Sequence, residues 1–449
     1  MPLTDTAARL RLLWHEIAAA ARGAMPSTGS SKLDGRQTQR LREELQAVLE
    51  ERGGEIAARA RAALAGQLYL SLDAEGRERF LRVLASFGAE RERVDGLAAE
   101  LCRTDEPAQR RRVERSLRRA LEPPRVALLR RFNSLPEGVK FLVDLRADLL
   151  DAAGDDQELR GLEGDLHDLL VSWFDIGFLE LRRITWDSPA ALLERLANYE
   201  AVHEVRGWSD IKNRLDADRR CFAFFHPLMP SEPLIFIEVA LVNELSGDIA
   251  ALLDQRAPLG AALTSTHAIF YSISNCQRGL VGISFGNALI KRVVDVLSTE
   301  LRNVKTFSTL SPIPGFSTWL EHADERPTGD GSPNALRAML AKRAWYRDPE
   351  SVEAVREPLM RLCAHYLIEE RRAGSTRALD PVAHFHLSNG AQIERINWLG
   401  DRSPRGLRES AGMMANYVYR LDQIDDNHQA YTQRGEIAAA SGVRRLLRH

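Results

Sequence analysis

Residues Cys221–Leu241 read CFAFFHPLMPSEPLIFIEVAL, and they predict part of a β-sheet. Two runs rich in aromatic and β-branched residues, Cys221–His226 and Leu234–Leu241, are joined by a proline-rich segment. Such runs, bounded by turn residues, are typical of adjacent strands. A third run, HAIFYSIS at His267–Ser274, predicts another strand of the same sheet.

The chain before this sheet is rich in alanine, leucine, arginine and glutamate from about Gln37 to Ile184. Apolar residues recur there at spacings of three and four, which is typical of amphipathic helices. Breaks at turn-forming residues leave helices of ordinary length, so we expect a helical bundle. The expected breaks are Gly53–Gly54, Leu72–Asp73, Pro123–Pro124 and the vicinity of Gly154.

The sequence changes character near Trp186, and Ser188–Pro189 is a good start for a new helix. A chain of 449 residues also exceeds what one hydrophobic core usually serves. We therefore expect an α+β protein with a helical domain at residues 1–187 and a sheet domain at residues 188–449. A polar loop at Asp324–Pro333 and helix at Asn334–Arg371 predict a helical insertion in the second domain.

Composition argues against several classes of partner. The 61 basic and 63 acidic residues give a formal net charge of -2, so no overall field attracts nucleic acid or a membrane. The basic run Arg110–Arg119 alternates with apolar and acidic residues, as a solvated helix face does. No apolar run approaches the roughly 18 residues that a membrane-spanning helix needs, so we expect a soluble protein.

The cysteines and the N-terminal segment bear on localisation. Four cysteines lie far apart and form no CxxC pair, which argues against a zinc site or a disulfide framework and favours a reducing, cytoplasmic compartment. The amphipathic segment Leu10–Met25 resembles a transit peptide, but Asp5, His15 and Glu16 interrupt that pattern. We expect an ordinary helix there.

A single hydroxyl stands out in Lys305–Leu320, KTFSTLSPIPGFSTWL. Ser311 lies between an apolar strand and a turn in which Pro312 and Pro314 fix φ and Gly315 permits a tight bend. Rigid loops after strands commonly carry functional side chains. The G-x-S-x-G motif of one class of nucleophilic serines is not present. Two interpretations of Ser311 therefore remain, a reactive hydroxyl and an ordinary turn residue.

A glycine-containing loop, QRGLVGISFG at Gln277–Gly286, leads into a predicted helix at Asn287–Leu301. A strand, a glycine turn and a helix N-terminus suit a phosphate group, because unpaired N–H groups and the helix dipole favour an anion there. The spacing of its glycines matches neither a P-loop nor a dinucleotide fingerprint, so a simple tight connection is the alternative.

Histidines and tyrosines near the C-terminus offer further candidates. His384 and His386 flank Phe385 in a predicted strand, where both imidazoles would share one face and could hold a metal, with His428 as the only other candidate ligand. The alternative is a hydrogen-bonded or catalytic histidine. Tyr417 and Tyr419 would likewise share a face, either as core residues or as part of a site.

Several strings in one order, from about Tyr199 to Arg420, closely resemble the malonyl-CoA decarboxylase family. They are YEAVHEVRGW, FFHPLMPSEPLIFIEVAL, SISNCQRGL, LIKRVVDVL, FSTLSPIPGF, FHLSNGA, RINW and MANYVY. The resemblance implies a catalytic domain with the N-acetyltransferase (GNAT) superfold, a mixed sheet that grips coenzyme A through a strand-to-helix loop. It also implies conversion of malonyl-CoA to acetyl-CoA and CO2 without metal, biotin or nicotinamide.

The resemblance assigns roles to particular residues. The serine of SPIPGF and the histidine of FHL are the family's catalytic pair, here Ser311 and His386, and Tyr419 joins their hydrogen-bond network. Family members carry a glutamate in GVELG where this chain reads GISFG, so the orienting carboxylate is replaced by Ser284. The substrate-binding residues expected in the loop are Gln277, Gly279, Gly282, Ser284 and Gly286.

The resemblance also implies a homo-oligomer, a dimer or tetramer, that assembles through the helical domain. Two other functions remain open at this point. An acyl-CoA acyltransferase would have the same coenzyme A binding loop but would need an acceptor amine. An inactive acyl-CoA sensor or scaffold would bind acyl-CoA without turnover.

Overall fold

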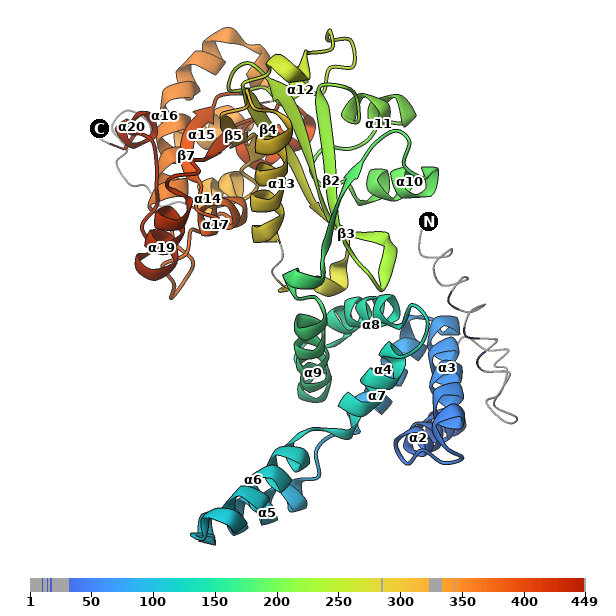
Figure 1. The fold of residues 1–449 in the computed structure, drawn as a ribbon. Coiled ribbons are helices and arrows are strands. Elements are labelled where there is room, and N and C mark those ends of the chain that lie inside the picture. Colours follow the sequence, from blue (N-terminus) through green and yellow to red (C-terminus); the bar gives the residue numbers. More distant parts are fainter. Residues whose placement is uncertain are drawn as a thin grey trace. The chain divides into compact units, whose positions relative to one another are not determined.

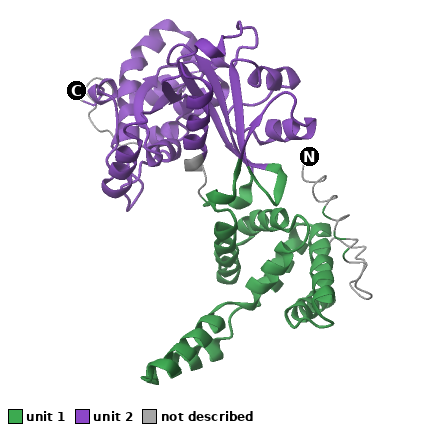
Figure 2. Ribbon diagram, viewed as in Figure 1, with its two compact units in different colours: residues 1–180, 225–232, 277–284 green, residues 181–224, 233–276, 285–449 purple. Residues whose placement is uncertain are grey.

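The computed structural model describes Leu10, Trp14, Ile17 and residues 32–283, 286–322, 333–342 and 344–447. The chain divides into two compact units, which Figure 2 colours green and purple. The first comprises residues 1–180, 225–232 and 277–284, and the second comprises residues 181–224, 233–276 and 285–449. The expected helix at Leu10–Met25 and the loop at Asp324–Pro333 lie largely outside the described residues.

The first unit is helical, as its periodicity predicts (Figure 1). Aspartates at the N-cap positions start three of the helices, because a carboxylate there accepts hydrogen bonds from otherwise unpaired amides. The predicted breaks fall between helices, except that Pro124 is the first residue of its helix. The helices are α2 (Gly35–Leu49), α3 (Glu55–Ser71), α4 (Ala74–Ala85), α5 (Arg91–Arg103), α6 (Pro107–Leu121), α7 (Pro124–Asn133), α8 (Gly138–Ala152) and α9 (Gln157–Trp173), followed by the 3-10 turn η1 (Ile176–Phe178).

Aromatic side chains fill the centre of the helical unit. Phe141 of α8 packs edge-on against Trp14 and Tyr69, with ring centroids 4.9 and 5.7 Å apart, and Tyr69 also meets Phe80. Burial of rings of this size contributes much of a small domain's stability. The helices α5 and α6, by contrast, bury only Val113 between them.

The second unit is built on a mixed sheet whose strands follow the order β1-β2-β3-β4-β5-β8-β6, with β7 also paired to β8 (Figure 1). Strand β4 runs antiparallel to β3 but parallel to β5, and β8 runs antiparallel to β5, β6 and β7. The α+β architecture expected from the sequence is confirmed. The strands are β1 (Glu180–Ile184), β2 (Arg219–His226), β3 (Met229–Val242), β4 (His267–Asn275), β5 (Thr306–Thr309), β6 (Ser311–Pro312), β7 (Gln392–Asn397) and β8 (Met414–Tyr419).

Helices surround this sheet, and four of those in the described residues lie between β6 and β7 in the chain. Part of the core lies between the sheet and α12, where Ile249 and Leu252 meet Ile269, Tyr271 and Met414. The helices are α10 (Ala190–Tyr199), α11 (Trp208–Arg214), α12 (Ile249–Leu252), α13 (Gly286–Glu300), α14 (Phe316–His322), α15 (Pro333–Leu340), α16 (Pro349–Ile368), α17 (Pro381–Ser388), α18 (Pro404–Ser410), α19 (Ile424–Arg434) and α20 (Ser441–Arg445), with the 3-10 turns η2 (Ala262–Thr264), η3 (Arg278–Leu280) and η4 (Trp345–Arg347).

The predicted strand around His384 and His386 is wrong, because these residues lie on the helix α17. Asp380 caps that helix with its side chain, and Pro381 occupies the first turn, where a proline costs no hydrogen bond. Residues two apart on a helix do not face each other, so the two imidazoles point in different directions.

Two other boundaries also differ from expectation. The end of the predicted helical stretch, Glu180–Ile184, forms β1. The single helical stretch expected at Asn334–Arg371 is divided into α15 and α16, because Asp348 and Pro349 begin a new helix.

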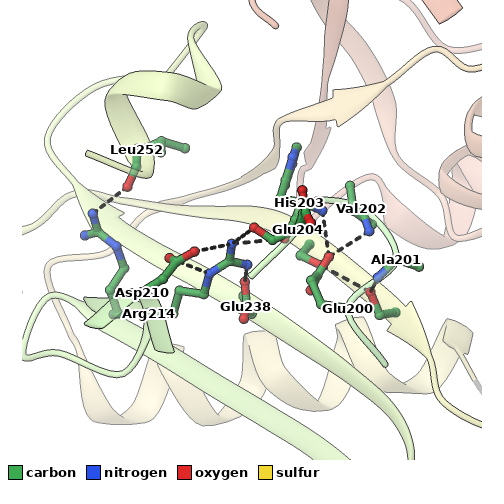
Figure 3. Close-up of polar contacts among 12 residues, drawn as sticks. Glu200, Ala201, Val202, His203, Glu204, Asp210, Arg214, Glu238 and Leu252 are labelled. Carbon is green, nitrogen blue, oxygen red and sulfur yellow. Dashed lines mark hydrogen bonds and ion pairs between the residues drawn. The ribbon is translucent and has the colours of Figure 1, made fainter. Parts of the chain in front are cut away.

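A buried ionic network anchors α11 to the sheet (Figure 3). The Arg214 guanidinium donates to Asp210 at 3.0 Å and to Glu238 of β3 at 2.9 Å. It also donates to the carbonyl oxygen of His203 at 3.0 Å. The three charged side chains are almost fully buried, so each depends on the others for solvation.

Candidate active site

Ser311 opens the short strand β6, and its place is set by the neighbouring strand β8. The register pairs Ser311 with Ala415 of β8. Alternate residues of a strand share a face, so Ala415, Tyr417 and Tyr419 lie on one side of β8, as the sequence predicts for the two tyrosines. Ser311 is buried at the margin of this surface, with 5% of its area exposed.

A continuous hydrogen-bond chain joins the three expected catalytic residues. Ser311 Oγ lies 3.0 Å from His386 Nε2, and His386 Nδ1 lies 2.8 Å from the Tyr419 hydroxyl. These groups come from β6, α17 and β8, and the bonded pairs are 75 and 33 residues apart in the chain. The fold therefore brings Ser311, His386 and Tyr419 together in one buried cluster.

Two further side chains complete the cluster, and neither was predicted from the sequence to be catalytic. Ser311 Oγ donates to Thr309 Oγ1 at 2.8 Å, and that oxygen also accepts from the Tyr417 amide at 3.2 Å. The Tyr417 ring stacks on the His386 imidazole, with centroids 4.6 Å apart. A signal for Thr309 existed, because its spacing of two from Ser311 suits a shared strand face.

Burial dominates the electrostatics of this cluster. Desolvation lowers the pKa of His386 to about 3, so the imidazole is neutral at physiological pH. Desolvation also raises the pKa of Tyr419 well above its usual range, which keeps the phenol protonated. The cluster is therefore an uncharged chain of hydrogen-bonding groups rather than an ion pair.

This neutrality predicts the pH dependence of turnover. We expect kcat to show no acid limb near pH 6.5, the pKa of an ordinary histidine, because His386 does not become charged until about pH 3. The same depressed pKa contributes stability above pH 6.5 that is lost as pH falls towards 3, since only the unfolded imidazole takes up a proton in that window. Initial rates at saturating substrate between pH 5 and 8 test this, and an acid limb centred near 6.5 would contradict it.

The glycine-containing loop is shaped first by its packing. A Cβ at Gly279 would lie 1.8 Å from the carbonyl oxygen of Val143 in α8, so only glycine fits there. Arg146 donates to the carbonyl oxygens of Gly279 and Val281 at 2.7 and 2.8 Å. This contact is a physical reason for the glycine at 279 that is independent of any ligand.

The other expected substrate-binding residues occupy the same loop. Gln277 is buried just before η3, Gly282 adopts a φ of 86°, and Gly286 begins α13. Ser284 lies outside the described residues. Substrate binding by this loop stays a prediction.

The metal hypothesis for the histidines gains no geometric support. His384 Nδ1 lies 2.8 Å from the Tyr431 hydroxyl, and His428 Nδ1 lies 2.6 Å from the carbonyl oxygen of Ser388. His386 instead bonds Ser311 and Tyr419. Across the part of the chain that the structure describes, no group of three or more acidic, histidine or cysteine side chains is arranged to hold a metal.

Comparison with protein families gives two matches that together cover most of the chain. Residues 177–449 match the malonyl-CoA decarboxylase C-terminal domain, and residues 87–174 match the malonyl-CoA decarboxylase N-terminal domain. The first match contains Ser311, His386 and Tyr419.

Individual relatives agree with the family match. The mitochondrial malonyl-CoA decarboxylase of Anser anser anser is 40% identical over 388 residues, which are 80% of this chain and 77% of the goose protein. The crystal structures of malonyl-CoA decarboxylase from Agrobacterium vitis and Rhodopseudomonas palustris each superpose with a TM-score of 0.84 at 42% identity, covering 91% of this chain and 99% of theirs. The chain therefore belongs to the malonyl-CoA decarboxylase family.

Proposed function

We propose that this protein converts malonyl-CoA to acetyl-CoA and CO2, as a carbon–carbon lyase. The observation that carries the proposal is the buried chain from Ser311 through His386 to Tyr419, in a protein of this family. Its groups are uncharged, which suits a reaction whose substrate loses a negative charge from one end. A cationic clamp on the substrate carboxylate would stabilise the ground state more than the transition state.

The reaction consumes one proton. The bond between the carboxylate carbon and the α-carbon breaks, CO2 leaves, and the electron pair forms the enolate of the thioester. A proton then adds to the α-carbon to give acetyl-CoA. The protein must stabilise the growing charge on the thioester oxygen and deliver that proton.

Roles for the three residues follow from their positions. The neutral Ser311 hydroxyl would hold the substrate carboxylate. When the Tyr419 hydroxyl donates to His386 Nδ1, the imidazole carries its proton on Nε2, facing Ser311. An enolate carbon is basic enough to take that proton, which leaves an imidazolate that still accepts the Tyr419 hydrogen bond. A proton from solvent then restores Nε2, so one solvent proton is consumed and Tyr419 stays protonated throughout.

The coenzyme A portion would bind the loop at Gln277–Gly286. Supporting this role is the helix α13 that follows the loop, whose first amides favour an anion. The proposed contacts are Gln277, Gly279, Gly282, Ser284 and Gly286. No cofactor enters the proposed reaction besides the coenzyme A thioester, which is the substrate.

Incubation with malonyl-CoA tests the function directly. The purified protein is treated with EDTA, given malonyl-CoA without any amine, and assayed for acetyl-CoA and CO2 by mass spectrometry. We expect equimolar release of both. Product that appears only with an added amine would indicate an acyltransferase, binding without turnover would indicate a sensor, and loss of activity on chelation would contradict the metal-free reaction.

We also infer a homo-oligomer, either a dimer or a tetramer. The support is that α5 buries no residue and α6 buries only Val113 in the single chain, so the apolar side chains of this hairpin are left for a partner. Light scattering should give a mass of two or four times 50.3 kDa, whereas a particle of 50.3 kDa would contradict self-association.

A cytoplasmic location is inferred from cysteine chemistry. All four cysteines are free, and Cys102 is exposed, as suits a reducing compartment. The goose and mouse relatives are named as mitochondrial proteins. None of the helices in the described ranges is long and apolar enough to cross a bilayer.

A further inference from the structure

The Asp380 carboxylate is fully buried in the second unit, at the start of α17. Its Oδ1 atom accepts hydrogen bonds from the Val382 amide at 3.0 Å and the Ala383 amide at 2.8 Å. These bonds cap the helix that carries His386, because they satisfy amides that have no partner within the helix.

The same carboxylate reaches the turn that follows Ser311. The Gly315 amide donates a hydrogen bond to it, and a Cβ at Gly315 would lie 3.7 Å from Asp380 Oδ2. That Cβ would also lie 2.2 Å from the Tyr366 hydroxyl, so a side chain at 315 would push the turn away. Glycine therefore permits the turn to approach Asp380 closely.

Tyr366 of α16 strengthens this junction. Its hydroxyl lies 3.4 Å from Asp380 Oδ2, and its ring packs against Phe316 and Trp319 of α14 at centroid distances of 5.8 and 5.3 Å. The segment from Ser311 into α14 thus packs against Asp380 and Tyr366. Asp380 also caps α17, so the two segments meet at these side chains.

We propose that Asp380 is a positioning residue, which joins the Ser311 turn to the His386 helix and so sets the contact between Ser311 Oγ and His386 Nε2. Ser311 precedes Gly315 by four residues, and His386 follows Asp380 by six, so one carboxylate fixes both segments. The inference deepens the proposed function, on which its kinetic test rests. A displacement near 1 Å at a reacting pair costs about 10²-fold in rate.

An asparagine at this position separates positioning from simple helix capping. Asparagine caps helices about as well as aspartate does. An asparagine side chain, however, has one oxygen where aspartate has two. If that oxygen accepts hydrogen bonds from the α17 amides, the NH2 group faces the Gly315 N–H, and two donors cannot bond each other. Asp380→Asn should therefore leave one segment unlinked.

We expect Asp380→Asn to lower kcat by about 10- to 100-fold with little change in KM. The loss should fall on kcat because Asp380 bonds Val382, Ala383 and Gly315, none of which belongs to the proposed coenzyme A loop. A matched control is Asp156→Asn, since Asp156 caps α9 through the same pair of amides, from Glu158 and Leu159. A folded Asp380→Asn protein with the kcat of the control would overturn the proposal.

A second pair of variants covers the case in which Asp380→Asn does not fold. Gly315→Ala places a methyl group against the Tyr366 hydroxyl, so we expect it to lower kcat. Adding Tyr366→Phe removes that hydroxyl and leaves the ring carbon at 3.4 Å, an ordinary contact, so kcat should recover in part. Equal kcat for wild type and Gly315→Ala would count against the junction.

A readout that needs no turnover keeps this inference separate from the proposed function. Nitrogen-15 NMR of the His386 ring reports which nitrogen carries the proton. We expect one tautomer in the wild type and a mixture in Asp380→Asn. If the wild type does not decarboxylate malonyl-CoA, the proposed function is wrong, but the positioning role is still tested by NMR. An unchanged tautomer in Asp380→Asn would then overturn the positioning role.

Discussion

Replacing His386 with asparagine is expected to lower kcat for malonyl-CoA by about 10²–10⁴-fold. The imidazole bonds both Ser311 and Tyr419, so its removal breaks the chain at its centre. Asparagine keeps a polar side chain, but its single amide cannot replace both imidazole nitrogens, which bond Ser311 and Tyr419. Steady-state rates with purified, folded protein measure the effect.

His384→Asn is the matched control for this prediction. His384 lies on the same helix α17 but bonds Tyr431, so we expect its kcat to stay near that of the wild type. Ser311→Ala adds a second check, because residues that act as one unit give non-additive losses. The double variant should then be little worse than the worse single variant. Equal activity of His386→Asn and His384→Asn would contradict the role of His386.

Local patterns predicted two central strands of the sheet and drew attention to Ser311. The runs at Cys221–His226 and Leu234–Leu241 are apolar throughout most of their length, and both became buried strands. Ser311 stood out because prolines and a glycine follow it. These signals are local, since they depend on neighbours in the chain, and a sequence shows them directly.

The same local reasoning failed at His384–His386. Alternation of polar and apolar residues over three positions suits a strand, but an N-capping aspartate followed by proline is a stronger signal for a helix. Recognising Asp380 and Pro381 as a helix start would have separated the two imidazoles. The error mattered, because it gave the metal hypothesis a shared face that does not exist.

Long-range contacts could not be read from the sequence. Nothing in the spacing of Gly315, Tyr366 and Asp380 shows that they meet in the fold. Their partners lie across strand pairings and helix packing that only the complete fold determines. The resemblance named the expected catalytic residues, whereas the proposed junction between their segments is visible only in the hydrogen bonds of Asp380.

The second large effect concerns stability rather than chemistry. Arg214→Met is expected to lower the free energy of unfolding of the second unit by about 3–5 kcal/mol. The substitution leaves the Asp210 and Glu238 carboxylates buried without the guanidinium that both contact (Figure 3). Native-state hydrogen exchange of the β3 amides measures this loss in the unit concerned.

Arg183→Met is the control, because Arg183 pairs with Glu300 in a half-exposed contact, which is worth under about 1 kcal/mol. A loss for Arg214→Met no larger than that of this control would contradict the prediction.

The loss should also depend on pH, and its sign follows from Glu238. Burial, opposed by Arg214, raises the pKa of Glu238 to about 7. A carboxyl with a raised pKa holds its proton in the folded state while the unfolded state releases it. Stability therefore falls as pH rises from about 4.5 to about 7. Without Arg214 the carboxylate is harder still to charge, so the window extends to higher pH. Arg214→Met should thus destabilise the protein more at pH 8 than at pH 5, whereas a pH-independent loss would mean that Glu238 does not titrate in this range.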